Sequence, residues 1–219
     1  MKEKLKVAVI GVGNIGTAVV TNLVKGGRSV IVANKEIQGA KELAEKLGGN
    51  VTAMEVGDAI KAADIIVFAV YFNVIQELFS TYNAELQGKI IVDPSNPIGL
   101  DDKGGFKKII GEKESSGEIL SSMLPAGAKF VKALGSLGAG SLAGASFQQP
   151  EKAVEFYATD EKSIEAAIEE LINDNGFEPV SIGGVNQSIR MEVFGDLHEF
   201  GALGKTVTAA EAKTTLQLS

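Results

Sequence analysis

The sequence predicts an α/β fold in which a mostly parallel sheet carries helices on both faces and a small α/β extension follows at the C-terminal end. Two observations lead to this prediction. Short apolar, β-branched runs alternate with segments whose apolar residues recur every three or four positions, which is the spacing of a helix. Apolar residues make up 45% of the chain and charged residues 22%, a balance typical of a protein that buries a core. Strands joined by such helices pair in parallel, because each crossover returns the chain to the same edge of the sheet.

The first two units illustrate the pattern. Residues 5–10 form an apolar run that ends at Gly11, and Ile15, Val19 and Leu23 then recur at helical spacing, so a strand, a turn and a helix are expected. The expected strands cover residues 5–10, 29–33, 51–54, 65–70, 89–92, 129–133, 154–158 and 179–182. The expected helices cover residues 15–24, 40–47, 57–63, 74–79, 116–123 and 164–172, the last with Asp160 as its N-cap.

Three stretches do not follow this alternation. Residues 99–117 are polar and contain glycine, which is typical of a long surface connection. Residues 135–144 hold too many small side chains to be assigned to a helix or a strand. The final 35 or so residues are expected to be helical, with interruptions at Gly201 and Gly204.

The composition excludes several kinds of chemistry. Cysteine is absent, so the chain cannot form a disulfide, a thiolate nucleophile or a cysteine-based metal centre. His198 is the single histidine, which excludes a histidine-rich metal site, and no Gly-x-Ser-x-Gly motif supplies a hydrolase nucleophile. The net charge of −7 argues against a nucleic-acid partner. No apolar run is long enough to span a membrane and the N-terminus does not resemble a signal peptide, so we expect a cytoplasmic protein without a membrane partner.

Three glycines after the first expected strand form the strongest motif. Gly11-Val12-Gly13-Asn14-Ile15-Gly16 is a G-x-G-x-x-G sequence between a strand and a helix. In that context the first glycine permits a tight turn, the second lets a pyrophosphate approach the backbone, and the third allows close packing of the helix. The motif predicts a doubly wound Rossmann domain that binds a dinucleotide over residues 1–147, with residues 148–219 as a small extension on the same sheet, in one compact unit. The alternative is a glycine turn without a ligand.

The end of the second expected strand bears on the choice of dinucleotide. Sites for NAD commonly place an acidic residue about 20 residues after the glycines, whereas sites for NADP carry a basic residue there. Asn34 and Lys35 occupy this position, and a neutral and a positive side chain favour the 2′-phosphate of NADP(H). The alternative is NAD, with Lys35 solvated and Glu36 bound to the ribose.

Two later strands are expected to border the nicotinamide half of the dinucleotide, because ligands of doubly wound sheets bind at the carboxyl ends of the strands. Val70, Tyr71 and Phe72 follow one of these strands, and either aromatic side chain could flank the ring or belong to the core. Ser95 and Asn96 follow the next strand in a turn between two prolines. They could hydrogen-bond the ribose or the carboxamide, or simply complete the turn.

Six segments of the chain match a known family in order and spacing. They are Lys6 to Gly16, Ala33 to Lys35, Val67 to Val70, Asp93 to Pro97, Ser116 to Glu118 and Val131 to Ala133. Together they resemble the NADPH-dependent reductases of the deazaflavin coenzyme F420, a family similar to the reductase domain of membrane ferric reductases. The resemblance implies a Rossmann domain with a small C-terminal extension, NADP(H) as cofactor and a homodimer. It also implies that the cofactor contacts Gly11, Gly13, Asn14, Ile15, Gly16, Asn34, Lys35, Val70, Asn96 and Ala133.

The chain departs from that family at three places. Asn34-Lys35 stand where the family often has Ser-Arg, which keeps a basic residue at this position. Tyr71 stands where the family has proline, and residues 134–136 read Leu-Gly-Ser where the family has Phe-Asn-Thr. The last departure lies where the second substrate is expected to bind, so the resemblance does not identify the hydride acceptor.

The residues and the resemblance together predict an NADP(H)-dependent oxidoreductase that transfers hydride between nicotinamide and coenzyme F420 or a flavin. The cofactors carry the reactive chemistry, so no catalytic side chain and no metal site are expected. The small side chains of residues 135–146 would let a planar ring lie close to the backbone, or else form a flexible crossing loop. His198, on an expected helix, is assigned to a surface or subunit contact. Arg190 is assigned to a salt bridge, and the alternative is that it holds an acidic tail or a phosphate of the second substrate. Two alternatives stay open: a small imine or keto-acid reductase of the pyrroline-carboxylate reductase type, and a module that senses NADP(H) without turnover.

Overall fold

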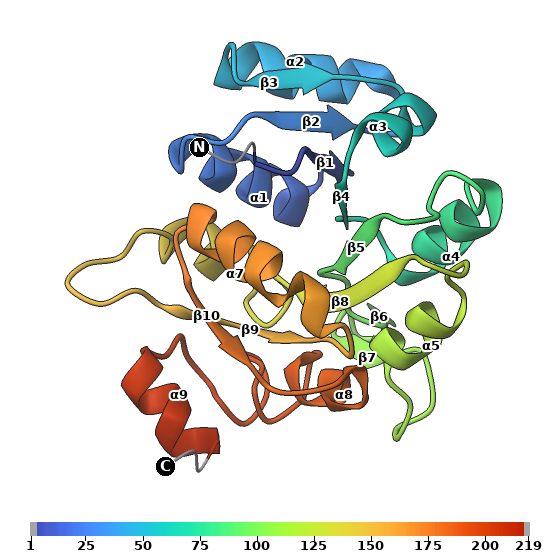
Figure 1. The fold of residues 1–219 in the computed structure, drawn as a ribbon. Coiled ribbons are helices and arrows are strands. Elements are labelled where there is room, and N and C mark those ends of the chain that lie inside the picture. Colours follow the sequence, from blue (N-terminus) through green and yellow to red (C-terminus); the bar gives the residue numbers. More distant parts are fainter. Residues whose placement is uncertain (1–3, 217–219) are drawn as a thin grey trace.

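An eight-stranded sheet forms the centre of the protein (Figure 1). The computed structural model describes residues 4–216. The strand order is β10-β9-β8-β5-β4-β1-β2-β3, and neighbouring strands are parallel except for β8 and β9. The strands of this sheet are β1 (Val7–Ile10), β2 (Val30–Ala33), β3 (Val51–Ala53), β4 (Ile65–Phe68), β5 (Ile90–Asp93), β8 (Lys129–Ala133), β9 (Val154–Ala158) and β10 (Glu178–Ser181). A separate antiparallel hairpin consists of β6 (Ile98–Leu100) and β7 (Phe106–Lys108).

Helices cover both faces of the sheet. They are α1 (Asn14–Lys25), α2 (Ile37–Leu47), α3 (Val56–Ala62), α4 (Phe72–Thr81), α5 (Ser116–Ser122), α6 (Ala139–Gly144), α7 (Glu165–Asp174), α8 (Ser188–Met191) and α9 (Ala209–Leu216). Single 3-10 turns lie at Lys162–Ile164 and Val185–Gln187. One face packs against α1, α2, α6 and α7, and the other against α3, α4 and α5, while α8 and α9 lie near β9 and β10 (Figure 1). Over residues 4–216, every helix is too short or too polar to reach across a membrane.

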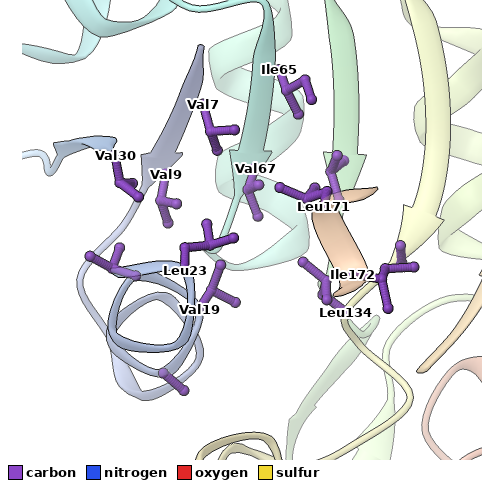
Figure 2. Close-up of a cluster of buried hydrophobic side chains, with 14 of the residues drawn as sticks. Val7, Val9, Val19, Leu23, Val30, Ile65, Val67, Leu134, Leu171 and Ile172 are labelled. Carbon is purple, nitrogen blue, oxygen red and sulfur yellow. The ribbon is translucent and has the colours of Figure 1, made fainter. Parts of the chain in front are cut away.

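Alternate residues of each central strand enter different cores. In β1, Val7 and Val9 point towards α1, while Ala8 points to the opposite face, because successive side chains of a strand alternate across the sheet. Figure 2 shows the first core, in which Leu23 of α1 and Leu171 of α7 approach the strands from the same side. Strands buried on both faces need apolar residues at every position, which explains the continuous apolar runs of the sequence.

The strand order reverses between β1 and β4. From β1 the chain continues outwards through β2 and β3, whereas β4, β5 and β8 extend in the other direction. The predicted fold class, a doubly wound and mostly parallel Rossmann sheet, is confirmed. Such a reversal leaves a crevice outside the carboxyl ends of the two central strands, and the glycine motif follows β1 at this point. Residues after 147 add β9 and β10 to the same sheet, and α7 connects these two strands.

Three local expectations from the sequence are wrong. Residues 99–117 are not a plain connection, because they contain most of the β6–β7 hairpin. Asp160 does not cap α7, since its Oδ1 accepts a hydrogen bond at 3.1 Å from the N–H of Val185, the first residue of the second 3-10 turn. Residues 192–208 form turns rather than a helix. The chain crosses itself tightly there, and a Cβ on Gly201 would collide with the carbonyl oxygen of Gly195.

Candidate functional site

Two glycines of the motif are required by close backbone contacts. Gly11 has a φ of +104°, and a Cβ at this position would collide with the carbonyl oxygen of Ala69 after β4. A Cβ on Gly16 would collide with the carbonyl oxygen of Gly11. The Gly11 N–H donates to the carbonyl of Ala33 at 2.8 Å, which ties the turn to the end of β2. These contacts bring the start of α1 against the carboxyl ends of β1, β2 and β4.

Gly13 differs from the other two glycines because space lies in front of it. A Cβ at this position would meet no atom within 4 Å, and its φ of −68° is an ordinary one. Gly13 is the N-cap of α1, no side chain caps the helix, and its first turn contains no acidic residue. The N–H groups of this turn therefore stay available to an anion, which the positive end of the helix dipole also favours. A pyrophosphate group fits this arrangement, with Asn14, Ile15 and Gly16 as the first residues of the helix.

The end of β2 exposes both possible ribose contacts. Asn34 is half-buried and its Nδ2 donates to the backbone carbonyl of Glu36 at 3.3 Å. Lys35 and Glu36 are both exposed. Glu36 is the N-cap residue of α2, but its side chain makes no capping hydrogen bond. Lys35 and Glu36 are therefore both available to a ligand.

The two aromatic residues after β4 have different environments. Phe72 is 6% exposed and belongs to the core beneath α4, whereas Tyr71 is 77% exposed and is the N-cap residue of this helix. Val70 lies beside the glycine turn, and its Cγ1 would be 2.7 Å from a Cβ on Gly11. Of the two aromatic side chains, Tyr71 is thus the one accessible to a ligand.

The turn after β5 is built on a buried ion pair. Lys132 of β8 donates to Asp93 Oδ2 at 2.6 Å and to Ser116 Oγ at 2.9 Å, and its side chain is 1% exposed. Glu192 lies 4.0 Å from the same ammonium group. Burial favours the neutral form of Glu192, but Lys132 and hydrogen bonds from the 115–117 segment outweigh it, so its pKa is lowered. The sequence did not predict that these three residues lie together. The position of Lys132 in an apolar, buried strand could have indicated it, because a buried ammonium group needs a carboxylate partner.

Ser95 and Asn96 have different roles in this turn. The Asn96 amide is engaged at both ends, because its Nδ2 donates to the carbonyl of Gly135 at 3.1 Å and its Oδ1 accepts from the Val193 N–H at 2.6 Å. It therefore links three segments of the chain. Ser95 is 8% exposed, and within the described residues its hydroxyl group has no hydrogen-bond partner. A buried hydroxyl without a partner at the carboxyl end of β5 is suited to a polar group of a ligand.

The small-residue segment after β8 is ordered by packing. Ala133 ends β8, Leu134 follows with a φ of +62°, and a Cβ on Gly135 would lie 2.5 Å from the carbonyl oxygen of Pro94. Residues 139–144 form α6, which packs against α1. The expectation of a flexible crossing loop is therefore wrong. Gly138 does not present an open wall either, since a Cβ there would lie 2.6 Å from Glu199 Oε1.

His198 lies neither on a helix nor at the surface, so both expectations are wrong. It is 1% exposed and lies in the turns after α8. Its Nδ1 accepts a hydrogen bond from the Phe200 N–H at 2.9 Å, and burial lowers its pKa to about 4. His198 is therefore a neutral, structural imidazole at physiological pH. The salt bridge assigned to Arg190 is present, because its Nη2 donates to Asp196 Oδ2 at 2.8 Å.

Glu155 of β9 is the most perturbed carboxyl group near this edge. It is fully buried, and its Oε2 accepts a hydrogen bond from Ser136 Oγ at 2.7 Å. Burial and, to a smaller extent, the nearby Glu199 raise its pKa from 4.5 to about 8, against the opposing effect of the hydrogen bond from Ser136. Glu155 is therefore mostly protonated at neutral pH in the folded protein.

The raised pKa of Glu155 predicts a stability that falls as pH increases. The folded protein keeps a proton that the unfolded chain has already released above pH 4.5, so this contribution is lost as pH rises through about 8. Between pH 6.5 and 8 the free energy of unfolding should fall by about 1–2 kcal/mol from this group. Urea denaturation across this range measures the fall. The variant E155Q should lack it, and an equal fall in wild type and E155Q would contradict the assignment.

Two hollows of the described structure lie away from the glycine motif. Hollows of about 480 and 500 Å³ flank α9, one lined by residues such as Leu203 and Thr214 and the other by residues such as Pro150 and Lys152. Neither includes a residue of the glycine motif. Within residues 4–216, no group of three or more His, Asp and Glu side chains is placed to hold a metal ion. The residues predicted from the sequence follow the carboxyl ends of β1, β2, β4, β5 and β8.

Comparison with known proteins supports the resemblance seen in the motifs. Residues 6–97 match the family described as NADP oxidoreductase coenzyme F420-dependent. The chain is also 27% identical over 191 residues to the metalloreductase STEAP3 of Rattus norvegicus, and the match covers 87% of this chain and 36% of that protein. The chain thus spans about a third of the length of this relative. The expected resemblance to the F420-dependent reductases and to ferric reductase domains is confirmed.

Solved structures share the fold over nearly the whole chain. A hypothetical protein from Sinorhizobium meliloti has a TM-score of 0.81 and 27% identity, over 93% of this chain and 95% of that one. A candidate F420-dependent NADP-reductase from Arthrobacter sp. FB24 has a TM-score of 0.72 and 20% identity, over 84% of this chain and 86% of that one. The second likeness is evidence for the fold alone.

Proposed function

We propose that this chain, whose residues 6–97 match the F420-dependent NADP oxidoreductase family, is an NADP(H)-dependent oxidoreductase that transfers hydride between nicotinamide and a deazaflavin or flavin-like acceptor. The observation that carries the proposal is the open space at Gly13, in front of a helix N-terminus that no side chain caps. In a glycine turn without a ligand, nothing would require this N-terminus to remain free of a capping side chain.

The residues available to hold the dinucleotide follow the edge of the sheet. The N–H groups at the start of α1, beyond Gly11 and Gly13, would bind the pyrophosphate. Asn34 and Lys35 would bind the ribose that carries the 2′-phosphate. The nicotinamide half would lie near the ends of β4, β5 and β8, whose residues there are Val70, Tyr71, Ser95, Asn96 and Ala133.

The side chains at this edge suit orientation rather than acid–base catalysis. The nicotinamide supplies the hydride when the dinucleotide is bound. Ser95 offers an unpartnered hydroxyl group, and Asn96 holds the loops around it in place. We therefore propose that the chain accelerates transfer by holding two rings in register and excluding water, without a catalytic side chain.

The acceptor is tested by stopped-flow oxidation of NADPH. Coenzyme F420, FMN, riboflavin and a ferric chelate are offered separately, and absorbance at the nicotinamide band is followed. Rapid oxidation with one of the ring acceptors is expected. Absence of turnover with all of them would contradict the proposal, and tight binding of NADPH without turnover would favour the sensing module.

Replacing Lys35 tests the choice of dinucleotide. The variant K35E places a carboxylate beside the proposed 2′-phosphate, so the Kd for NADPH should rise about tenfold while the Kd for NADH changes less than about threefold. Fluorescence titration of both reduced nucleotides measures the ratio. K46E, at the exposed C-terminal turn of α2, is the matched control with the same charge change. Equal weakening of NADPH and NADH by K35E would argue against a phosphate contact.

We propose that residues 148–219 act as an extension of the nucleotide-binding domain, that the protein is a homodimer, and that it works in the cytoplasm. Light scattering after size-exclusion chromatography would measure the mass in solution and so test the dimer.

A further inference from the structure

A short segment after α8 lies against the loops that follow β5 and β8, and we call residues 192–202 the cap segment. Its first residue is anchored by a buried carboxylate, since Glu192 Oε1 accepts hydrogen bonds from Ser115 Oγ at 2.8 Å and Ser116 Oγ at 2.9 Å. The next residue is anchored by its backbone, because the Val193 N–H donates to Asn96 Oδ1 at 2.6 Å. Two consecutive residues thus determine where the cap segment begins.

The far end of the cap segment is anchored on the loop after β8. The Glu199 N–H donates to the carbonyl of Ser136 at 3.1 Å, and Glu199 Oε1 accepts from the Gly138 N–H at 2.7 Å. Leu197 and His198 are buried between these anchors. The cap segment is therefore held at both ends over the edge where the nicotinamide half of the dinucleotide is proposed to lie.

Two phenylalanines of the cap segment stay exposed despite this anchoring. Phe194 has a φ of +75°, which a bulky residue rarely adopts, and is 54% exposed. Phe200 is 60% exposed, and its ring lies so close to Gly138 that a Cβ there would be 2.6 Å from Cζ. Strained backbone of this kind persists only where its surroundings impose it, and it is concentrated at functional sites. Neither ring contributes fully to the core, so core packing does not explain them.

We infer that Phe194 and Phe200 form the contact surface for the hydride acceptor, and that this acceptor is a flavin-type ring with an uncharged tail. The inference rests on the function proposed above, because it assigns the second substrate of the same edge. Aromatic side chains stack on flat rings, and two of them held rigidly lose little entropy on binding.

The charges of the cap segment favour the uncharged tail. Its ionisable residues other than His198 are all acidic: Glu192, Asp196 and Glu199. The nearest preceding cation, Arg190, is already bound to Asp196 in a two-point contact. Glu192 and Glu199 are buried, and Asp196 is the exposed one of the three. Phosphate or carboxylate groups of a tail would find no free cation within residues 192–202 and would meet the carboxylate of Asp196, whereas a neutral tail would not be repelled.

The test measures binding of riboflavin by quenching of its fluorescence, with NADP⁺ present, so the readout does not depend on turnover. In F194G the Kd for riboflavin should rise at least tenfold, with the Kd for NADPH unchanged. The thermal midpoint should not fall, because glycine adopts a positive φ freely. F194N, which also tolerates this backbone, should give the same result. The control is F147G, since Phe147 also has a positive φ, of 58°, but lies beside Lys25 at the C-terminal end of α1.

Four outcomes would overturn the inference. The first is that the wild type does not bind riboflavin, and the second is that the riboflavin Kd is unchanged in F194G and F194N. The third is that FMN binds more tightly than riboflavin. The fourth is that the oligomeric mass of F194G changes while its riboflavin Kd does not, because this result would indicate that Phe194 is a subunit contact. Failure of the proposed function is distinguishable from these. If riboflavin binds through Phe194 but NADPH is not oxidised, the proposed function fails, and the two phenylalanines form a flavin-binding surface that does not serve hydride transfer. If NADPH is oxidised while F194G binds riboflavin normally, the contact surface fails alone.

Discussion

The variant G13D should lose at least about 100-fold in affinity for NADPH while folding as well as the wild type. A carboxylate at this position would lie in the space proposed for the pyrophosphate, and two like charges about 4 Å apart repel by about 4 kcal/mol in a partly exposed site. The same carboxylate would cap α1, since aspartate is a favourable N-cap and a negative charge suits the helix N-terminus. Binding and stability should therefore change in opposite directions, with a thermal midpoint unchanged or raised by about 1–4 °C.

Isothermal titration with NADPH and thermal unfolding together measure this result. The matched control is G49D, which adds the same charge at an exposed glycine before β3, where a Cβ would also meet no atom within 4 Å. Because β3 begins at the opposite edge of the sheet, G49D should bind NADPH normally. If G13D bound NADPH as tightly as G49D does, the glycine motif would not be the pyrophosphate site.

The variant K132M should lose about 3–5 kcal/mol of stability, because it removes the cation from a buried cluster of charges. Asp93 is 0% exposed and Glu192 is 1% exposed, so both would remain as uncompensated buried carboxylates. Methionine nearly preserves the length of the side chain, which keeps the loss from cavity formation small. For a domain of this size the loss corresponds to a fall of about 6–20 °C in the thermal midpoint.

Denaturant unfolding of three variants separates the charge effect from general damage. K129M changes a lysine of the same strand whose ammonium group donates to the exposed Ser163 hydroxyl at 3.0 Å, so it should cost less than about 1 kcal/mol. The double variant D93N/K132M should be more stable than K132M alone, because it also removes one stranded carboxylate. A loss in K132M no larger than in K129M would show that the buried pair contributes little to stability.

Much of the sheet could be predicted because its signals are local. The apolar runs of β1, β4 and β5 are continuous, since these strands are covered on both faces, and glycine marks the turn that follows β1. The hairpin within residues 98–108 was missed because each of its strands has only three residues and none of them is buried, so no apolar alternation marks it. The helix expected after residue 192 was wrong because apolar residues there pack into turns held by distant partners, such as Asn96 on Val193.

Of the candidate site, the sequence could predict the glycine motif but not the environments of the residues near the proposed nicotinamide position. The glycine motif was predictable because its requirements lie within one turn of the chain. The turn must pass close to a strand at Gly11 and Gly16, and it must leave the N-terminus of α1 free at Gly13. The environments of Tyr71 and Phe72 could not be separated, since adjacent residues at a strand end enter opposite surroundings only once α4 has packed. His198 was misplaced for the same reason, because its burial depends on the loops after β5 and β8.

Local patterns in the chain were thus sufficient for the fold class, the dinucleotide motif and the absence of cysteine chemistry, since each depends on residues close together in the sequence or on composition. The tertiary structure alone decided which groups lie together near the carboxyl ends of β5 and β8. Asp93, Lys132 and Glu192 are far apart in sequence and meet only because β5, β8 and the cap segment converge. Phe194, whose φ is +75°, follows a residue whose N–H donates to Asn96, 97 positions earlier in the chain, and no local pattern records that contact.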